Sequence, residues 1–299
     1  MELQMEHKES SISFKKLRQE RRRKNILSFL EKFSENKIAV VGALIVLIYV
    51  FVATFAPWLA PYDPYEINLE NKLQSPNSSH WMGTDDKGRD ILSRIIYGSR
   101  LSMGIGFAAV LFGSFFGIMM GMAAGYYGGW VDAILSRMLD VMLAFPGILL
   151  ALAIISALGP SLLNVTFAVG VFSIPLFARI ARGSTMEVRN LEYIDAIRSL
   201  GANDTTIIFN HILPNILSPL IIQATLRLAT AILSAAGLSF LGLGAQPPSS
   251  EWGTMLSNGR DFLFSAPHVA IFPGLAIAFL VMGFNLFGDG LRDALDPRK

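Results

Sequence analysis

The chain contains no cysteine and unusually few charged residues. The absence of cysteine excludes disulfides, Cys-ligated metal sites and a cysteine nucleophile. Only 16% of the 299 residues are charged, whereas ordinary soluble domains have about 25%. A soluble protein so poor in charge would expose too much apolar surface to water, and a lipid environment removes that problem. The net charge of +2 is too small to indicate a nucleic-acid ligand.

Motifs for covalent and nucleotide chemistry are missing as well. There is no Gly-x-x-x-x-Gly-Lys-[Ser/Thr] loop to cradle phosphates and no His-Glu-x-x-His pair. The four histidines are scattered through the sequence, at His7, His80, His211 and His268. We therefore predict that the chain is not an enzyme, has no catalytic residues, and binds no metal or cofactor of its own. Any energy from ATP must then come from a partner.

What the sequence does contain is six long apolar stretches. Each is close to the roughly 20 residues that a helix needs to cross ~30 Å of hydrocarbon, and none shows the period-2 alternation of barrel strands. The stretches are Ile38–Ala60, Leu101–Ala124, Met138–Leu158, Leu162–Ile180, Ile216–Leu238 and Val269–Phe287. Taken singly, the third and fourth, interrupted by Pro146 and Pro175, also fit buried helices of a large soluble protein. Together the six predict an all-α membrane protein with six transmembrane helices.

The distribution of Lys and Arg predicts the orientation of these spans. The first stretch follows a long basic tail and is too long for a cleaved signal peptide, so we interpret it as a signal anchor. With the N-terminus inside, the inner segments carry 18 Lys and Arg residues and the outer loops carry six, as the positive-inside rule requires. Both termini are then cytoplasmic, and residues 61–100 and 242–268 form the outer loops. The basic run Lys15–Lys24 fits a topology determinant better than a lipid-binding segment.

These spans divide the chain into four regions. Residues 1–37 form a basic cytoplasmic region, and residues 38–99 hold the first span and the first outer loop. Residues 100–289 form a five-helix core with a cytoplasmic loop at 181–215, and residues 290–299 form a cytoplasmic tail.

The inner loop has the pattern of a helix, a glycine and a second helix. Apolar residues recur at steps of three within Glu187–Leu200, which favours one buried face. Gly201 follows, where a left-handed cap needs no Cβ. Asn203 or Asp204 can cap a short helix over Thr205–His211, which Pro214 ends before the fifth span. On spacing alone, the element is equally well explained as a lever moved by a partner or as a loop lying on the membrane surface.

The same loop resembles the cytoplasmic signature of ATP-binding-cassette importer permeases, in which Glu-Ala-Ala leads to Gly and then to Ile-x-Leu-Pro. This chain has Asp195-Ala196-Ile197, then Gly201, then His211-Ile212-Leu213-Pro214. It departs from the signature at Asp195, Ile197 and His211. Other segments resemble the C-type permease of dipeptide and oligopeptide importers, namely His80–Asp90, Leu238–Gly244 and Asn285–Asp293.

The resemblance implies a type I importer permease fold in a bacterial plasma membrane. It also implies partners: a homologous second permease, two ATPases that bind ATP and Mg, and an extracytoplasmic substrate-binding protein. The expected cargo is a dipeptide or oligopeptide, with nickel, a metallophore or glutathione as alternatives. An ion-driven secondary transporter is a more distant alternative, because the span interiors have almost no acidic residues. The residues that the resemblance assigns to ATPase coupling are Glu192, Asp195, Ala196, Gly201, Ala202, Leu213 and Pro214.

Two further features lie within the spans. Gly113, Gly117, Gly121 and Gly125 recur at four-residue steps, which predicts a smooth stripe for close helix packing against an unknown partner. Arg227 lies near mid-membrane in the fifth span. It either lines the pathway and attracts a peptide carboxylate, or pairs with an acidic group or helix C-terminus elsewhere in the complex. We prefer the second interpretation, with Asp140 as a weak candidate partner within this chain.

Outside the spans, Asp90 is expected to cap a short helix over Ile91–Tyr97. Ile91, Ile95 and Ile96 would face the membrane surface, and contact with a binding protein is the alternative. Four prolines fall within spans and are candidate hinges, although ordinary transmembrane proline enrichment explains them nearly as well. These prolines are Pro146, Pro175, Pro219 and Pro273.

Overall fold

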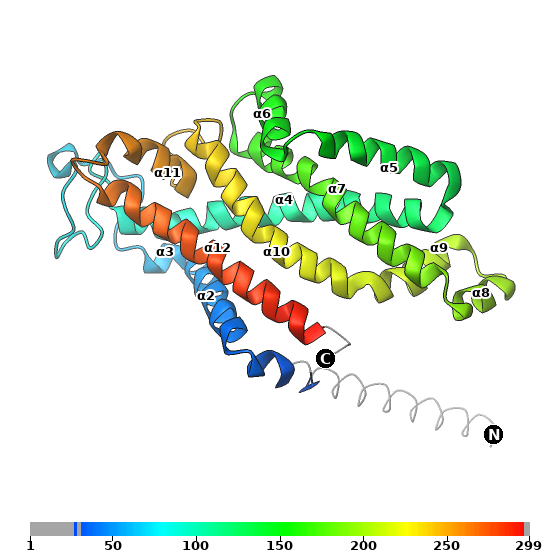
Figure 1. Cartoon of the computed structure of the whole chain (residues 1–299). Coiled ribbons are helices and arrows are strands. Elements are labelled where there is room, and N and C mark those ends of the chain that lie inside the picture. The colour runs from blue at the N-terminus through cyan, green and yellow to red at the C-terminus, as the bar shows by residue number, and fades with distance from the viewer. Residues whose placement is uncertain (1–26, 29–30, 296–299) are drawn as a thin grey trace, which may run out of the picture.

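The computed structural model describes residues 27–28 and 31–295 (Figure 1). Lys15–Lys24 and residues 296–299, on which part of the orientation prediction rests, lie outside the described residues. The long helices are α2 (Lys37–Thr54), α4 (Ile91–Tyr127), α5 (Gly129–Ala144), α6 (Gly147–Leu158), α7 (Leu162–Arg189), α10 (Leu213–Phe240) and α12 (His268–Leu295). The short helices are α3 (Ala56–Leu59), η1 (Leu69–Asn71), α8 (Glu192–Ser199), α9 (Asp204–Thr206), η2 (Ile207–Ile212), α11 (Trp252–Gly259) and η3 (Arg260–Phe262).

The described residues confirm a multi-pass helical membrane protein. Five helices are long and apolar enough to cross a bilayer, and a sixth span results if the bent pair α5 and α6 is counted as one. That pair corrects the prediction of a single helix over Met138–Leu158, because the chain turns by 89° between its two halves. Pro146 explains the break: it lacks an N–H group, and it holds Phe145 in an extended conformation (ψ 135°). By contrast, α7, α10 and α12 each continue through an internal proline.

The second span is longer than the apolar stretch that predicted it. Helix α4 has 37 residues, which corresponds to about 55 Å at 1.5 Å per residue. The expected separate surface helix over Ile91–Tyr97 is the first part of α4. Its Ile91 and Ile96 are buried in protein, so the prediction that they face the membrane was wrong. The helix continues through Gly98. The missing side chain at this position leaves room for the backbone of Ser250 and the indole of Trp252.

Helices α4 and α7 run in the same direction through the centre of the bundle. The four-residue glycine stripe of α4 lies against α7 of the same chain. A Cβ at Gly113 would lie 2.7 Å from the Ser173 Cβ, and one at Gly125 would lie 2.7 Å from the Arg182 carbonyl oxygen. Only glycine at these positions allows the two backbones to come so close.

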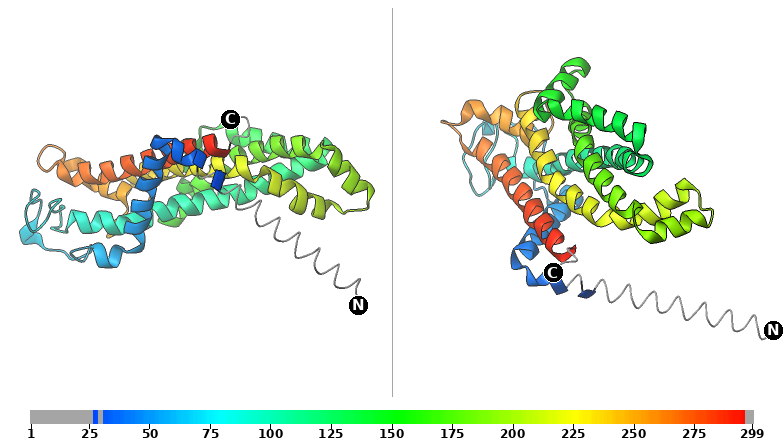
Figure 2. Two further views of the ribbon diagram at one scale, coloured as in Figure 1. Left: turned by 90° about the horizontal axis from the view of Figure 1, so that it is seen from below. Right: turned by 45° about the vertical axis from the view of Figure 1, so that its right-hand side comes forward.

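The remaining long helices pack around this pair. Helix α12 lies between α10 and α2, and the views agree on this order (Figures 1 and 2). The Tyr49 hydroxyl on α2 donates to the Ala276 carbonyl on α12 over 2.9 Å. The loops 61–90 and 242–267 gather at one end of the bundle, and α8 and α9 lie at the opposite end (Figure 1). The chain therefore has two structured polar ends separated by its apolar spans.

Candidate functional site

The segment 190–212, here called the lever, connects α7 to α10. The predicted helix over Glu187–Leu200 begins too early, because α7 runs to Arg189 and the extended residue Leu191 (ψ 136°) separates it from α8. The expected apolar face is only partly buried: Ile194 is fully buried, while Leu191 is 45% exposed and Leu200 is 87% exposed. Helical spacing predicted a periodic face, but the chain turn at Asn190 changes which residues of that face meet the bundle.

A glycine turn closes α8 as expected. Gly201 has φ +87°, a left-handed conformation that costs other residues about 1–2 kcal/mol. The Gly201 amide donates to the Arg198 carbonyl (3.0 Å), and the Ala202 amide donates to the Ile197 carbonyl (3.3 Å). These two bonds form a Schellman motif. Ile197 and Ala202 also pack against the same hydrophobic cluster, so the turn is fixed in position.

The second half of the lever joins directly to α10. Asn203 is the cap, with its side chain accepting a hydrogen bond from the Thr206 amide (2.8 Å). The prediction that Pro214 ends this helix was wrong. A π-helical turn over Ile207–Ile212 leads into α10, and Pro214 occupies the first turn of α10, where a missing N–H group is tolerated. The second half of the lever and the span are therefore one continuous helical unit from Asp204 to Phe240.

The lever is braced against the end of α4. The Tyr126 hydroxyl donates to Asp204 Oδ1 over 2.6 Å, and the Arg198 guanidinium lies 5.8 Å from the centre of the Tyr126 ring. Beneath these contacts is a compact apolar cluster in which Ile194, Ile207 and Ile212 are fully buried. The lever is therefore packed against α4, α7 and α10 with no gap at this cluster.

The outer surface of the lever is charged, with exposed Leu200 beside it. Most of the residues assigned to coupling are on this surface: Glu192, Asp195, Ala196, Gly201 and Pro214 are exposed, while Ala202 and Leu213 are half-buried. Beside the lever, a cavity of about 580 Å³ opens between the ends of α7, α10 and α12, with Glu187 and Arg292 in its wall.

Arg227 lies on α10 and contacts α7. Its Nε donates to the Ser173 hydroxyl (3.2 Å), its Nη1 donates to the Thr230 hydroxyl (3.2 Å), and its Cζ lies 4.8 Å from the centre of the Phe172 ring. The weak candidate partner Asp140 is not in contact with it, because Asp140 pairs with Arg179 over 2.9 Å. No carboxylate of the described residues forms an ion pair with Arg227.

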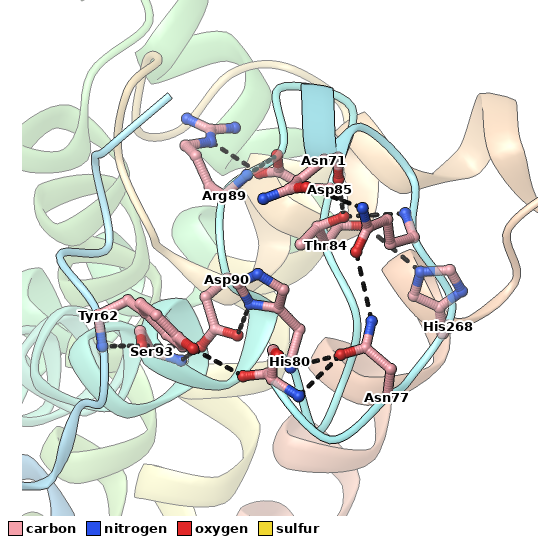
Figure 3. Close-up of polar contacts among 12 residues, drawn as sticks. Tyr62, Asn71, Asn77, His80, Thr84, Asp85, Arg89, Asp90, Ser93 and His268 are labelled. Carbon is pink, nitrogen blue, oxygen red and sulfur yellow. Dashed lines mark hydrogen bonds and ion pairs between the residues drawn. The ribbon is translucent and has the colours of Figure 1, made fainter. Parts of the chain in front are cut away.

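At the opposite end, a network of buried polar groups holds the first loop together (Figure 3). Asp90 caps α4 as predicted, accepting from the Ser93 amide (2.7 Å), and it also contacts His80 Nδ1 (2.9 Å). Asp85 accepts from Arg89 Nε (2.7 Å), and His268 at the start of α12 contacts the Thr84 carbonyl (3.3 Å). The loop is thereby tied to two spans.

The two loops at this end form one unit with the first turn of α4, here called the cap (residues 61–95 and 242–267). Arg94, which is 1% exposed, donates to the carbonyls of Pro64 (3.1 Å) and Ser249 (2.7 Å). The fully buried Trp252 donates through Nε1 to the Ile95 carbonyl (3.1 Å). Sequence reasoning assigned no role to Arg94 or Trp252, since nothing local indicates that a loop residue packs on a helix more than 150 positions away.

Comparisons with known proteins were consistent with this architecture. Residues 113–299 match the family described as binding-protein-dependent transport system inner membrane component, and residues 27–76 match the N-terminal transmembrane domain of oligopeptide transport permease C. The chain is 51% identical over 268 residues to the dipeptide transport system permease protein DppC of Alkalihalophilus pseudofirmus, covering 90% of this chain and 88% of that protein.

A second relative has a different named cargo. The chain is 49% identical over 271 residues to the glutathione transport system permease protein GsiD of Pectobacterium atrosepticum, covering 90% of each. Among solved structures, it resembles a chain of the inward-facing MetNI methionine ABC transporter with a TM-score of 0.55 and 20% identity. That match covers 69% of this chain and 98% of the other, and it shows a shared fold.

Proposed function

This chain belongs to the family of inner membrane components of binding-protein-dependent transport systems, and from that premise we propose that it forms half of the pathway of an ATP-driven peptide importer. The observation that carries the proposal is the lever: its buried side is packed against three spans and its exposed side is open to a partner. We assign it the role of receiving the movement of an ATPase.

The proposed cargo is a dipeptide or oligopeptide. Support comes from the dipeptide permease of A. pseudofirmus, which is similar along nearly the whole chain. Glutathione is the second candidate, because the P. atrosepticum glutathione permease is almost as similar. Glutathione is itself a tripeptide with free carboxylates, so both candidates present a pathway with the same kinds of polar groups.

The proposed assembly has four kinds of subunit. A homologous second permease completes the pathway, two ATPases bind ATP and Mg, and a binding protein delivers cargo from outside. This chain supplies no ATP hydrolysis, which is in keeping with its lack of a phosphate-binding glycine loop. The lever would then lie on the cytoplasmic side of a bacterial inner membrane and the cap on the outer side, with both chain termini cytoplasmic.

The proposed mechanism is mechanical. When the ATPases close, the exposed tip of the lever moves with them. The tip includes Glu192, Asp195 and Leu200. Because α9, the π-turn and α10 are continuous, and because Ile194 and Ile207 are buried in one cluster, the movement reaches α7 and α10 without a flexible linker. Gly201 and Ala202 hold the turn, and Leu213 and Pro214 begin the moving span.

Uptake of labelled dipeptide, measured in cells that depend on this permease, tests the proposal. Leu200→Asp places a charge on the exposed tip, and we expect at least about tenfold less uptake with a normal amount of folded protein. A tenfold loss corresponds to about 1.4 kcal/mol of docking free energy. Leu200→Met is the matched control, since it keeps an apolar side chain of similar volume, and it should transport normally.

Two outcomes would contradict the proposal. If Leu200→Asp transports as well as the wild type, the lever does not receive the ATPase. If the wild-type chain restores uptake of neither dipeptides nor glutathione, the cargo assignment is wrong.

A further inference from the structure

Arg227 lies halfway along α10 and is partly buried in the isolated chain. The helix runs from Leu213 to Phe240, so Arg227 is about 20 Å from either end at 1.5 Å per residue. Thr230 lies one turn further along the same stripe of α10 and is exposed in the isolated chain. A charge at this depth cannot face lipid without a cost of at least about 2.5–3.5 kcal/mol. This stripe must therefore face protein or a water-filled path.

The guanidinium is held in one orientation by two hydroxyls. The Ser173 hydroxyl donates its proton to the Val169 carbonyl (2.7 Å), and the Thr230 hydroxyl donates to the Arg227 carbonyl (3.0 Å). With their protons committed to the backbone, both hydroxyl oxygens act as acceptors toward Arg227. The Phe172 ring below adds a cation–π contact. Such fixing lowers the entropy that binding a ligand would cost.

Most of the hydrogen-bonding capacity of this guanidinium is uncommitted. A guanidinium has five N–H donors, and only Nε and Nη1 bond to groups of the described residues. Nη2 has no partner among those residues. The two acidic groups of α5 pair with other arginines, since Asp132 pairs with Arg182 and Asp140 pairs with Arg179. The site is a preoriented cation without an anion.

We propose that Arg227 binds the terminal carboxylate of the peptide as it crosses the membrane; this inference rests on the proposed function. A carboxylate is the anion whose planar geometry matches the guanidinium fork, and a free C-terminus is common to peptides of every sequence. Recognition of this group suits a pathway that must accept many side chains. Arg227 is only partly buried in the isolated chain, so water can reach the pair and weaken it enough for release.

Two of the three side chains that orient Arg227, Ser173 and Phe172, belong to α7, the helix that leads into the lever. Ser173 and Phe172 are on α7, which continues to Arg189 and into the lever, whereas Arg227 is on α10, which leaves it. A movement of the lever that shifts α7 along α10 would change the support of the guanidinium. The affinity for carboxylate would then differ between the states of the transport cycle.

The experiment compares a dipeptide with its C-terminal amide in proteoliposomes that contain the complete complex and its binding protein. Each rate is divided by the wild-type rate for the same compound, so any preference of the binding protein cancels. For Arg227→Met we expect at least about a fivefold loss for the free dipeptide and less than a twofold change for the amide. Arg227→Lys should recover part of the loss, because it keeps the charge without the fork.

The controls separate this site from a structural role. Ser173→Ala keeps the cation but removes one support, and it should lower uptake of the free dipeptide only, by about two- to threefold. Equal losses for dipeptide and amide in Arg227→Met would overturn the proposal and indicate a carboxylate of the second permease as the partner. Unchanged uptake of both would overturn it as well.

Two contingencies are covered by the same design. If Arg227→Met fails to assemble, the ratio of amide to free dipeptide in Arg227→Lys decides: a ratio above that of the wild type supports the site, and an equal ratio overturns it. If the wild-type complex transports neither compound, the proposed peptide function fails, whatever the variants do.

Discussion

The cap and the lever are both polar segments next to the spans, yet only the cap buries charged residues. In the cap, Arg94 and Glu251 are buried, and the groups that meet them belong to the same chain. In the lever, Glu192 and Asp195 are exposed, and Leu200 is the most exposed apolar residue of the segment. The buried charges of the cap are thus partnered within this chain, while the charged residues of the lever are all exposed.

This difference follows from what buried polar groups require. A buried charge without a partner costs several kcal/mol, so each buried charge of the cap needs a hydrogen-bond or ion-pair partner in the folded chain. Glu251 illustrates this by capping α11 through the Gly253 and Thr254 amides (2.9 and 2.8 Å). Exposed charges cost little in water, so the lever can keep them for a partner. Burial thus distinguishes a structural polar cluster from an interaction surface.

Helix α4 joins these two regions. Asp90 caps its first turn in the cap, and Tyr126 in its last turn bonds to Asp204 in the lever. Between them, the glycine stripe brings α7 against α4. Variants at the cap, at the glycine stripe and at the lever should therefore differ in how much they lower protein stability and how much they lower transport per ATP hydrolysed.

The largest expected effect is at the cap. Arg94→Met removes the donor to the Pro64 and Ser249 carbonyls and the ion pair to Asp85 (3.5 Å). We expect a loss of about 3–5 kcal/mol in the free energy of unfolding, because breaking one partner of a buried pair leaves the others unsatisfied. The apparent unfolding temperature of the complex in detergent measures the loss.

Arg100→Met is the control for this variant. Arg100 is on the same helix but is exposed, and its replacement should change the unfolding free energy by no more than about 0.5 kcal/mol. Equal unfolding free energies for the two variants would mean that the buried Arg94 contributes no more than an exposed arginine, and the contrast between cap and lever would not hold.

An intermediate effect is expected at the stripe. In Gly121→Val the new Cβ would overlap the Ala178 carbonyl oxygen and lie 2.7 Å from the Ala181 Cβ. Overpacking of this kind costs about 1–3 kcal/mol, and it should separate α4 from α7 and reduce coupling. Transport per ATP hydrolysed, measured in proteoliposomes, should fall together with thermal stability.

Gly104→Val is the matched control on the same helix. Nothing lies within 4 Å of a Cβ placed there, so the substitution tests the intrinsic effect of valine alone. A fall as large as that of Gly121→Val would show that valine in the helix, and not contact with α7, causes the loss.

The smallest expected effect is at the lever. Tyr126→Phe removes the 2.6 Å hydrogen bond to Asp204, a loss of about 1 kcal/mol. Amide hydrogen exchange over residues 204–212 should then accelerate roughly fivefold, with exchange in the cap unchanged. Tyr127→Phe, beside it and exposed, is the control. Faster exchange in the cap as well would indicate global destabilisation in place of local release of the lever.

Much of the fold was predictable because the bilayer imposes it. A fixed hydrocarbon thickness demands stretches of about 20 apolar residues, so their positions could be read from the sequence. Local signals succeeded because they depend only on neighbouring residues. Asp90 caps α4 through Ser93, and Gly201 adopts its left-handed turn after α8. The family resemblance at Asp195 to Pro214 added an expected role for the lever.

The rest was decided by contacts between distant parts of the chain. Nothing near Arg227 in the sequence predicts its hydrogen bond to Ser173, 54 positions away. Likewise, nothing near Arg94 predicts its hydrogen bond to Ser249, 155 positions away. Hydropathy gave the third apolar stretch a length but not its 89° turn. The sequence by itself determined which segments are apolar enough to cross the membrane and how the turns at Asp90 and Gly201 close, because those depend on solvent and on adjacent residues. Only the tertiary structure decided which polar groups are paired and which remain open to a ligand or a partner, because pairing depends on distances that folding alone sets.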